Sequence, residues 1–196
     1  MSDAATDNGR RRFLAITTAA VGGAGVAAAS IPFIKSWNPT LRVKAAGLPV
    51  EVNISKLEPG QMIRVEWRGK PIWVVRRTQE MLQDLGLHND KLRDPLSLEP
   101  QQPAYATNTT RSIKPDVFIA VGICTHLGCS PVYQRDGFSG QMEGIAAGFL
   151  CPCHGSGFDM AGRVFQGQPA PLNLVVPPHR YLDDERVIIG VDEEIG

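Results

Sequence analysis

Four cysteines and two histidines, gathered in two short segments, constrain this chain more than any other feature of its sequence. "CTHLGC" runs from Cys124 to Cys129, and "CPCH" runs from Cys151 to His154. The chain has no cysteine outside these segments and only two further histidines. Cysteines paired in short motifs, rather than scattered along the chain, indicate a metal site rather than a disulfide scaffold. The fold must therefore bring two separate segments together.

Each segment offers one thiolate and one imidazole, which are both ordinary ligands of soft and borderline metal ions. The two sets are Cys124-x-His126 and Cys151-x-x-His154. Two cysteines and two histidines form a normal zinc site, but structural zinc usually uses C-x2–4-C pairs. Because each segment here contributes a mixed pair, we favour an iron–sulfur cluster and keep a structural zinc ion as an alternative.

The cysteines that are left, Cys129 and Cys153, also occur one in each segment. Two loops that hold one centre would bring them close together, and in an exported domain they could then form a disulfide. Glycines accompany both segments at Gly128, Gly155 and Gly157. Glycine lets backbone N–H groups approach closely and point at anionic sulfur, which suits a cluster better than a zinc ion.

The composition fits one main domain of ordinary size with an appendage. The chain has 196 residues, of which 43% are hydrophobic, and this fraction is enough for a packed core. Its 20 basic and 20 acidic residues balance, so no nucleic acid is expected as a partner, because phosphate binding needs a basic excess. The 20 glycines and 15 prolines favour a loop-rich β domain over a helix bundle.

The N-terminal segment is predicted to be a membrane anchor. Three arginines, Arg10 to Arg12, precede an uncharged run of 22 residues from Phe13 to Ile34. At about 1.5 Å per residue such a helix spans about 33 Å, which covers a hydrocarbon core of about 30 Å. A buried soluble helix is disfavoured because the run has no polar face. A cleaved signal peptide stays open, because the alanines at 27–29 offer a cleavage site.

The stretch "GRRRFLA", residues 9–15, resembles a twin-arginine export signal, an address used for proteins that are exported already folded. Export after folding suits a protein whose cofactor is inserted in the cytoplasm. We therefore expect residues 1–12 to be cytoplasmic and residues 13–34 to cross the bacterial inner membrane once, with a periplasmic domain beyond. Residues 35–49 contain Pro39, Gly47 and Pro49 and are interpreted as a flexible hinge.

Residues 50–196 are predicted to form short strands separated by turns. "QMIRVEWRG" and "KPIWVVRRT" alternate in hydropathy and predict a hairpin around Gly69-Lys70, and "DVFIAVGIC" predicts a buried strand. "TQEMLQDL" predicts a short helix with Thr78 as its N-cap. His88 and His179 lie outside both motifs and are expected on the surface. Short strands with frequent turns predict an antiparallel sandwich or a small barrel.

The segments "CTHLGC" and "CPCHGSGFD" resemble the cluster-binding loops of Rieske iron–sulfur proteins. The resemblance implies a mainly β fold, an antiparallel sandwich with a small cluster-binding subdomain, over residues 50–196. It also implies one [2Fe–2S] cluster per chain, with two cysteines on one iron and two histidines on the other. By the same resemblance the ligands are Cys124, His126, Cys151 and His154. The remaining pair, Cys129 and Cys153, would form a disulfide.

The anchor, "KLRDP" at residues 91–95 and "QPAPLNL" at residues 168–174 resemble the Rieske subunit of respiratory cytochrome bc complexes. This implies the iron–sulfur subunit of a quinol:cytochrome c oxidoreductase that contributes to proton translocation. Such a subunit takes one electron with a proton from ubiquinol at cytochrome b and passes the electron to a c-type haem subunit, within a dimeric complex. The alternative function is the Rieske subunit of a periplasmic molybdenum oxidase of the arsenite oxidase type.

The resemblance also implies roles for residues in the loops at 124–130, 151–159 and 167–171. His154 would hydrogen-bond the quinol and accept its proton along with the electron, and Ser156 would hydrogen-bond a cluster sulfur. The docking face would consist of Leu127, Pro169, Ala170 and Pro171.

The sequence departs from the family pattern in three places. Phe158 stands where relatives often have a tyrosine whose hydroxyl bonds a ligand sulfur. The absence of that hydroxyl predicts a lower reduction potential than in the relatives with tyrosine. Gln168 separates Gly167 from Pro169, where relatives often have Gly-Pro-Ala-Pro, so the third loop could be shaped differently. Residues 130–150 form a longer connection than in mitochondrial relatives, and they are predicted to be an extended surface hairpin.

Overall fold

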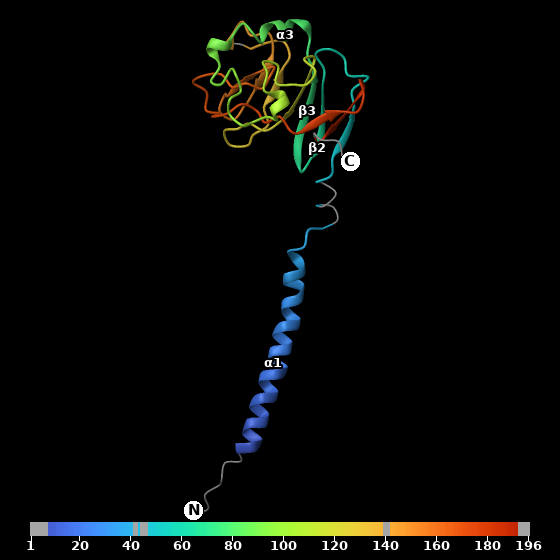
Figure 1. Cartoon of the computed structure of the whole chain (residues 1–196). Coiled ribbons are helices and arrows are strands. Elements are labelled where there is room, and N and C mark those ends of the chain that lie inside the picture. Colours follow the sequence, from blue (N-terminus) through green and yellow to red (C-terminus); the bar gives the residue numbers. More distant parts are fainter. Residues whose placement is uncertain (1–7, 41–42, 44–46, 139–141, 192–196) are drawn as a thin grey trace, which may run out of the picture. The chain divides into compact units, whose positions relative to one another are not determined.

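A computed structural model describes residues 8–40, 43, 47–138 and 142–191. The chain divides into two compact units, residues 1–45 and residues 46–196. The first contains helix α1 (Asn8–Ser36) (Figure 1). Side chains are exposed along almost the whole described length of this helix. By length and composition this helix could cross a membrane, which agrees with the predicted span at 13–34, although the helix itself begins before the three arginines.

Three antiparallel sheets of three strands each form the described part of the second unit, so the predicted mainly β class is confirmed. The first sheet has the order β1 (Val50–Asn53), β9 (Arg186–Ile189), β8 (His179–Tyr181). The second has the order β2 (Met62–Trp67), β3 (Lys70–Arg76), β4 (Val117–Val121). The third has the order β5 (Val132–Gln134), β6 (Gly148–Leu150), β7 (Gly157–Asp159).

The β2–β3–β4 sheet is the middle layer, because both of its faces are buried. All five residues of β4 are buried. Its odd-numbered members, such as Ile119, join a core with Val52 of β1 and Val187 of β9. Its even-numbered members, Phe118 and Ala120, join a second core that contains the two free cysteine thiols. Alternation between two buried faces explains why "DVFIAV" is apolar at every position of the strand.

A two-residue turn joins β2 to β3. Trp67 pairs with Lys70, and the turn residues Arg68 and Gly69 have φ angles of 52° and 70°. Positive φ at both central positions is the geometry that matches the twist of a tight hairpin, and glycine adopts it without strain. The predicted hairpin is therefore confirmed, with its turn one residue earlier than expected.

The predicted helix is also confirmed as α3 (Gln79–Asp84). The Thr78 side chain accepts a hydrogen bond from the Met81 N–H at 3.2 Å, as an N-cap should. The connection to β4 contains two short 3₁₀ helices, η1 (Asn89–Lys91) and η2 (Ala104–Ala106).

The two histidines outside the cysteine motifs differ in burial. His88 is partly exposed and pairs with Asp84 at 3.2 Å. The expectation that His179 lies on the surface is wrong: it is 1% exposed. Its Nδ1 is 2.8 Å from the Pro177 carbonyl, and its backbone N–H donates to the Tyr105 hydroxyl. Strand β8 begins at His179 and carries the ring into the interior.

Residues 130–150 form the predicted hairpin, since β5 and β6 pair in antiparallel register; residues 139–141 lie outside the described part. Phe138, Met142 and Ile145 of this segment pack with Leu92 and Phe165 in a small separate core. A side chain at residue 157 would collide with the Met142 sulfur, so glycine there allows the hairpin to lie against the second cysteine loop.

A buried ion pair closes the turn that follows β7. Arg163 Nε donates to Asp159 Oδ2 at 2.7 Å, and the side chains are 1% and 7% exposed, respectively. Asp159 Oδ1 also accepts the backbone N–H groups of Ala161 and Arg163 at 2.9 and 2.8 Å. Arg163 Nη2 donates to the Leu85 carbonyl at 2.6 Å, so the pair links this turn to the end of α3.

Replacing Asp159 with alanine should lower the unfolding free energy by about 3–5 kcal/mol, because it leaves a buried guanidinium without its partner. Asp183→Ala is the matched control, since Asp183 pairs with Arg186 at the same 2.7 Å but the side chains are 43% and 47% exposed, respectively. Thermal unfolding of the detergent-solubilised chain measures both. Equal losses in the two variants would contradict the assignment of the stabilisation to burial.

Candidate metal centre

The two cysteine loops are closed by the same pair of backbone hydrogen bonds. In the first loop Cys124 N donates to Cys129 O at 2.7 Å, and Gly128 N donates to Cys124 O at 3.1 Å. In the second loop Cys151 N donates to Ser156 O at 2.8 Å, and Gly155 N donates to Cys151 O at 2.9 Å, at the same spacings in the sequence. The fourth residue after each cysteine is a glycine, Gly128 or Gly155, with φ of 85° or 77°. The left-handed conformation that closes each loop favours glycine.

The free thiols of the two loops lie side by side in the core. Cys124 and Cys151 form no disulfide, and each is 2% exposed. Burial raises the pKa of the Cys124 thiol, and the neighbouring Cys151 thiol acts in the same direction. The backbone N–H of His126 and the hydroxyl of Ser156 act in the opposite direction and lower the pKa of the Cys124 thiol. These donors favour an anionic sulfur, as a metal-bound thiolate requires.

The histidines of the two loops meet on the solvent side of the thiols. The ring centroids of His126 and His154 are 4.7 Å apart, with their planes at 83°. His154 is exposed and His126 is half-buried. The site is therefore polarised, with thiol ligands available from the core and imidazole ligands available from the surface.

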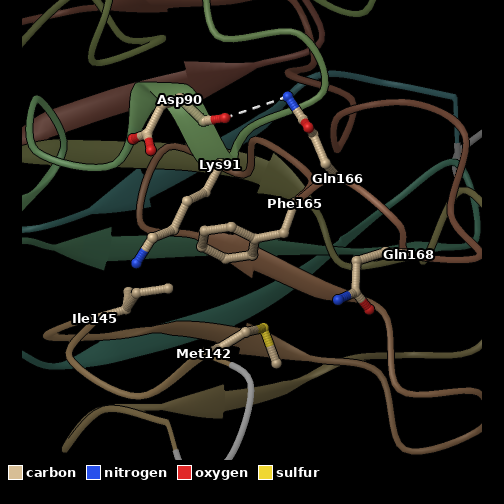
Figure 2. Close-up of a pocket in the computed structure, with 7 residues that line it drawn as sticks. All are labelled: Asp90, Lys91, Met142, Ile145, Phe165, Gln166 and Gln168. Carbon is tan, nitrogen blue, oxygen red and sulfur yellow. Dashed lines mark hydrogen bonds between the residues drawn. The ribbon is translucent and has the colours of Figure 1, made fainter.

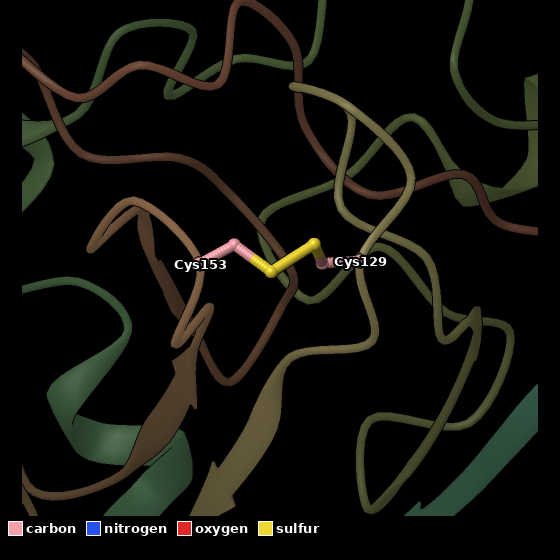
Figure 3. The surroundings of a disulfide bond; sticks show 2 residues. All are labelled: Cys129 and Cys153. Carbon is pink, nitrogen blue, oxygen red and sulfur yellow. A yellow bond between two sulfur atoms is a disulfide. The ribbon is translucent and has the colours of Figure 1, made fainter.

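The two remaining cysteines form the predicted disulfide, which ties the first loop to the second (Figure 3). The Cα atoms of Cys129 and Cys153 are 6.7 Å apart. Their sulfurs and that of Cys151 lie within 4.8 Å of one another, so the disulfide is adjacent to the free thiols. Because Cys129 and Cys153 are consumed by this bond, the thiolates that these loops can offer a metal come from Cys124 and Cys151.

A third loop, residues 167–171, is hydrogen-bonded to both cysteine loops. The Ala170 N–H donates to Ser156 Oγ at 3.0 Å, and Ser156 is fully buried. Immediately after the loop, the Leu172 carbonyl accepts the hydroxyl of Thr125 at 2.6 Å. Three separate parts of the chain are thereby fixed around one site.

The structure corrects one member of the predicted docking face. Leu127 is 71% exposed, and Pro169 and Pro171 are also exposed. Ala170 is 0% exposed, and its side chain packs in the core that contains the thiols. Its N–H points inward to Ser156, so the side chain of this residue faces the interior rather than a partner.

Phe158 is fully buried directly behind the second loop. It pairs with Phe149 in the register of β6 and β7, and it belongs to the same core as Cys124 and Cys151. Phe149 in turn stacks on Trp73 of β3, with ring centroids 4.8 Å apart. The position that was singled out in the sequence is thus close-packed and apolar.

Two buried arginines behind the site were missed by sequence reasoning. Arg77 Nη1 donates to the carbonyls of Thr110 and Met160 at 2.8 and 3.2 Å. Arg111 donates to the carbonyls of Ala161 and Leu174 at 2.9 and 2.8 Å. Burial lowers the pKa of each guanidinium to about 10, so both stay charged at neutral pH. Nothing in the local sequence distinguishes these arginines from exposed ones.

The donor set of these loops fits a Rieske cluster, which needs two thiolates and two imidazoles. Residues 49–178 match the Rieske [2Fe-2S] domain family. Residues 1–40 match the family described as the TAT signal of the ubiquinol–cytochrome c reductase Fe-S subunit.

Among curated relatives, the ubiquinol-cytochrome c reductase iron-sulfur subunit of Allochromatium vinosum is 53% identical over 196 residues, covering 98% of this chain and 93% of that protein. The protein of the same name from Rhodospirillum rubrum is 43% identical over 184 residues, covering 94% and 93%. A chain of a solved structure titled "Hyperthermophilic respiratory Complex III" is 26% identical with a TM-score of 0.48, covering 89% of this chain and 99% of that chain.

The family match over the domain and the identity to these relatives over nearly the whole chain lead to one conclusion. The chain belongs to the Rieske [2Fe–2S] family, among relatives that are named as the iron–sulfur subunit of ubiquinol-cytochrome c reductase.

Proposed function

We propose that this chain is the iron–sulfur subunit of a ubiquinol–cytochrome c reductase. The observation that carries the proposal is that the cysteines and histidines of the two loops differ in burial and in bonding. Each loop carries one buried thiol and one more exposed histidine, the two histidine rings lie together, and the other two cysteines form the disulfide that joins the loops. Relatives with the same name match along nearly the whole chain rather than over the loops alone.

In this proposal the buried thiols of Cys124 and Cys151 hold one iron, and His126 and His154 hold the other. When bound, the [2Fe–2S] cluster accepts and releases one electron. The histidine-bound iron would lie nearer to the solvent than the cysteine-bound one, because His126 is half-buried and His154 is exposed whereas both thiols are buried. Ser156 would hydrogen-bond a cluster sulfur and so stabilise negative charge there.

The exposed imidazole of His154 is the group that would meet ubiquinol. A ring nitrogen that is not bound to iron can accept a hydrogen bond from the quinol hydroxyl and take its proton as the electron leaves. Leu127 and the two prolines of the third loop are exposed apolar residues, which suits docking on cytochrome b and then on a c-type haem subunit.

The N-terminal part of the chain supports a membrane-anchored subunit. In the proposal residues 1–12 are cytoplasmic, residues 13–34 span the inner membrane, and the domain from residue 50 is periplasmic, as a twin-arginine signal requires. Residues 35–49 act as a hinge that lets the domain visit two partners within a dimeric complex; residues 41–42 and 44–46 lie outside the described part.

The alternative of a periplasmic molybdenum oxidase subunit is not favoured. The matching relatives are named for quinol oxidation, and the match includes the segment described as the signal of that subunit.

Reduced protein should give an electron paramagnetic resonance signal of the Rieske type that shifts when a quinol-site inhibitor binds the complex. His126→Ala should abolish this signal, because the outer iron loses a ligand. His88→Ala is the matched control, since His88 is a partly buried histidine outside the cysteine loops. Loss of the signal in both variants, or in neither, would contradict the ligand assignment.

Phe158→Tyr should raise the midpoint potential by roughly 20–60 mV, because one hydrogen bond of about 0.5–1.5 kcal/mol would favour the reduced, more negative cluster. Phe138→Tyr adds the same hydroxyl in the hairpin of residues 130–150 and should leave the potential unchanged. A redox titration followed by the paramagnetic signal measures both variants. An unchanged potential in Phe158→Tyr would refute the role given to the missing hydroxyl.

Prolines at residues 45, 46 and 47 should slow turnover several-fold while leaving the spectrum of the cluster intact, because a stiff hinge hinders the movement between partners. Gly47→Ala is the control, since it produces three successive alanines without the fixed φ of proline. Turnover is measured as quinol-dependent reduction of cytochrome c. Normal turnover in the proline variant would show that this segment does not act as a hinge.

A further inference from the structure

The third loop, residues 167–171, is packed in the core through Ala170, but it borders two cavities at its ends. A cavity of about 310 Å³ lies on one side, between Lys91, Met142, Phe165 and Gln168 (Figure 2). A second cavity, of about 420 Å³, lies between Arg93, Leu98, Pro171 and Leu172. Because the cavities leave the ends of the loop without close packing, hydrogen bonds contribute to fixing the position of those ends.

Few hydrogen bonds are available to the loop itself. Pro169 and Pro171 have no N–H, so Ala170 supplies the amide donor of this tripeptide. That donor is directed to Ser156 Oγ at 3.0 Å. At the start of the loop the Gln168 carbonyl accepts a hydrogen bond from Arg93 Nη2 at 3.0 Å. Gln168 is the residue at which this sequence departs from the Gly-Pro-Ala-Pro pattern.

Arg93 reaches the loop from a backbone that is itself held in place. Its N–H donates to the Val164 carbonyl at 3.0 Å, and the Gln166 N–H donates to the Lys91 carbonyl at 2.8 Å. The Gln166 side chain also donates to the carbonyls of Asp90 and Leu92, the first of which is visible in Figure 2. The segment before Arg93 is thereby fastened to the strand-like segment before the third loop.

The orientation of the Ser156 hydroxyl depends on this arrangement. Ser156 Oγ accepts the Ala170 N–H, so its own proton is free for another acceptor, and in the proposed function that acceptor is a cluster sulfur. If the loop moved away, the oxygen would lose its donor and the hydroxyl would be free to rotate. A hydroxyl that is fixed toward sulfur stabilises negative charge there, whereas a rotating one does so less.

We infer that Arg93 is a positioning residue for the cluster site: by holding the Gln168 carbonyl, it keeps the Ala170 N–H on Ser156 and so fixes the orientation of the Ser156 hydroxyl beside the cysteine loops. This inference rests on the proposed function, because it assigns Arg93 an effect on the reduction potential of the cluster. Arg93 touches no ligand, so its effect passes entirely through the third loop.

The test uses Arg93→Ala and Arg93→Lys in the full chain within the membrane complex. Arg64→Ala is the matched control, because Arg64 is an exposed arginine on β2 and its loss removes the same charge. The first readout is the midpoint potential of the cluster. The second is hydrogen–deuterium exchange in a peptide covering residues 167–172, which does not depend on activity.

Arg93→Ala should lower the potential by more than Arg64→Ala does and should speed exchange in residues 167–172. In Arg93→Lys the potential and the exchange rate should both lie closer to the wild-type values than in Arg93→Ala, since an ammonium group can still donate to one carbonyl. The inference is overturned if Arg93→Ala shifts the potential no more than Arg64→Ala, or if exchange is unchanged.

The two proposals fail in different ways. Absence of a Rieske signal in the wild-type chain overturns the proposed function and, with it, the effect of Arg93 on a potential. A normal signal, with equal potentials in Arg93→Ala and Arg64→Ala, overturns the inference about Arg93 and leaves the proposed function standing.

Discussion

The matching hydrogen bonds that close the two cysteine loops are the constraint on which the rest of the site depends. Each loop is pinned by the N–H of its first cysteine and closed by a glycine in the left-handed conformation. This closure places one buried thiol and one more exposed imidazole in each loop. The disulfide then joins the loops to each other, and the Ala170 N–H and Thr125 hydroxyl join the third loop to both.

The two kinds of potential ligand differ in burial. The thiols face a core that continues through Phe149 and Trp73 to the middle sheet, while the imidazoles face solvent. A cluster held in this way would be insulated on its cysteine side and accessible on its histidine side, which suits exchange of an electron with partners that dock at the surface. Behind the loops, guanidinium groups hold backbone carbonyls that the sheets leave unpaired, at the cost of burying charge.

Local patterns in the sequence were sufficient for several elements. The continuous apolar run in "DVFIAV", the Thr78 cap and the cysteine motifs predict β4, α3 and the two loops that carry the thiols. The inward side chain of Ala170 and the burial of His179 could not be predicted, because both depend on contacts with segments distant in sequence. The same holds for Arg77 and Arg111, whose carbonyl partners lie more than thirty residues away. Each loop has a glycine four residues after its first cysteine. The sequence shows this spacing, but only the hydrogen bonds show that the glycine closes the loop.

Mössbauer spectroscopy of the oxidised, ⁵⁷Fe-enriched protein tests the central claim most directly, because the quadrupole splitting and isomer shift of each iron report its own ligands. The account predicts two components of equal area with different parameters, one for an iron with two cysteine ligands and one for an iron with two histidine ligands. A single component from two equivalent irons, or a purified protein that contains zinc and no iron, would contradict it.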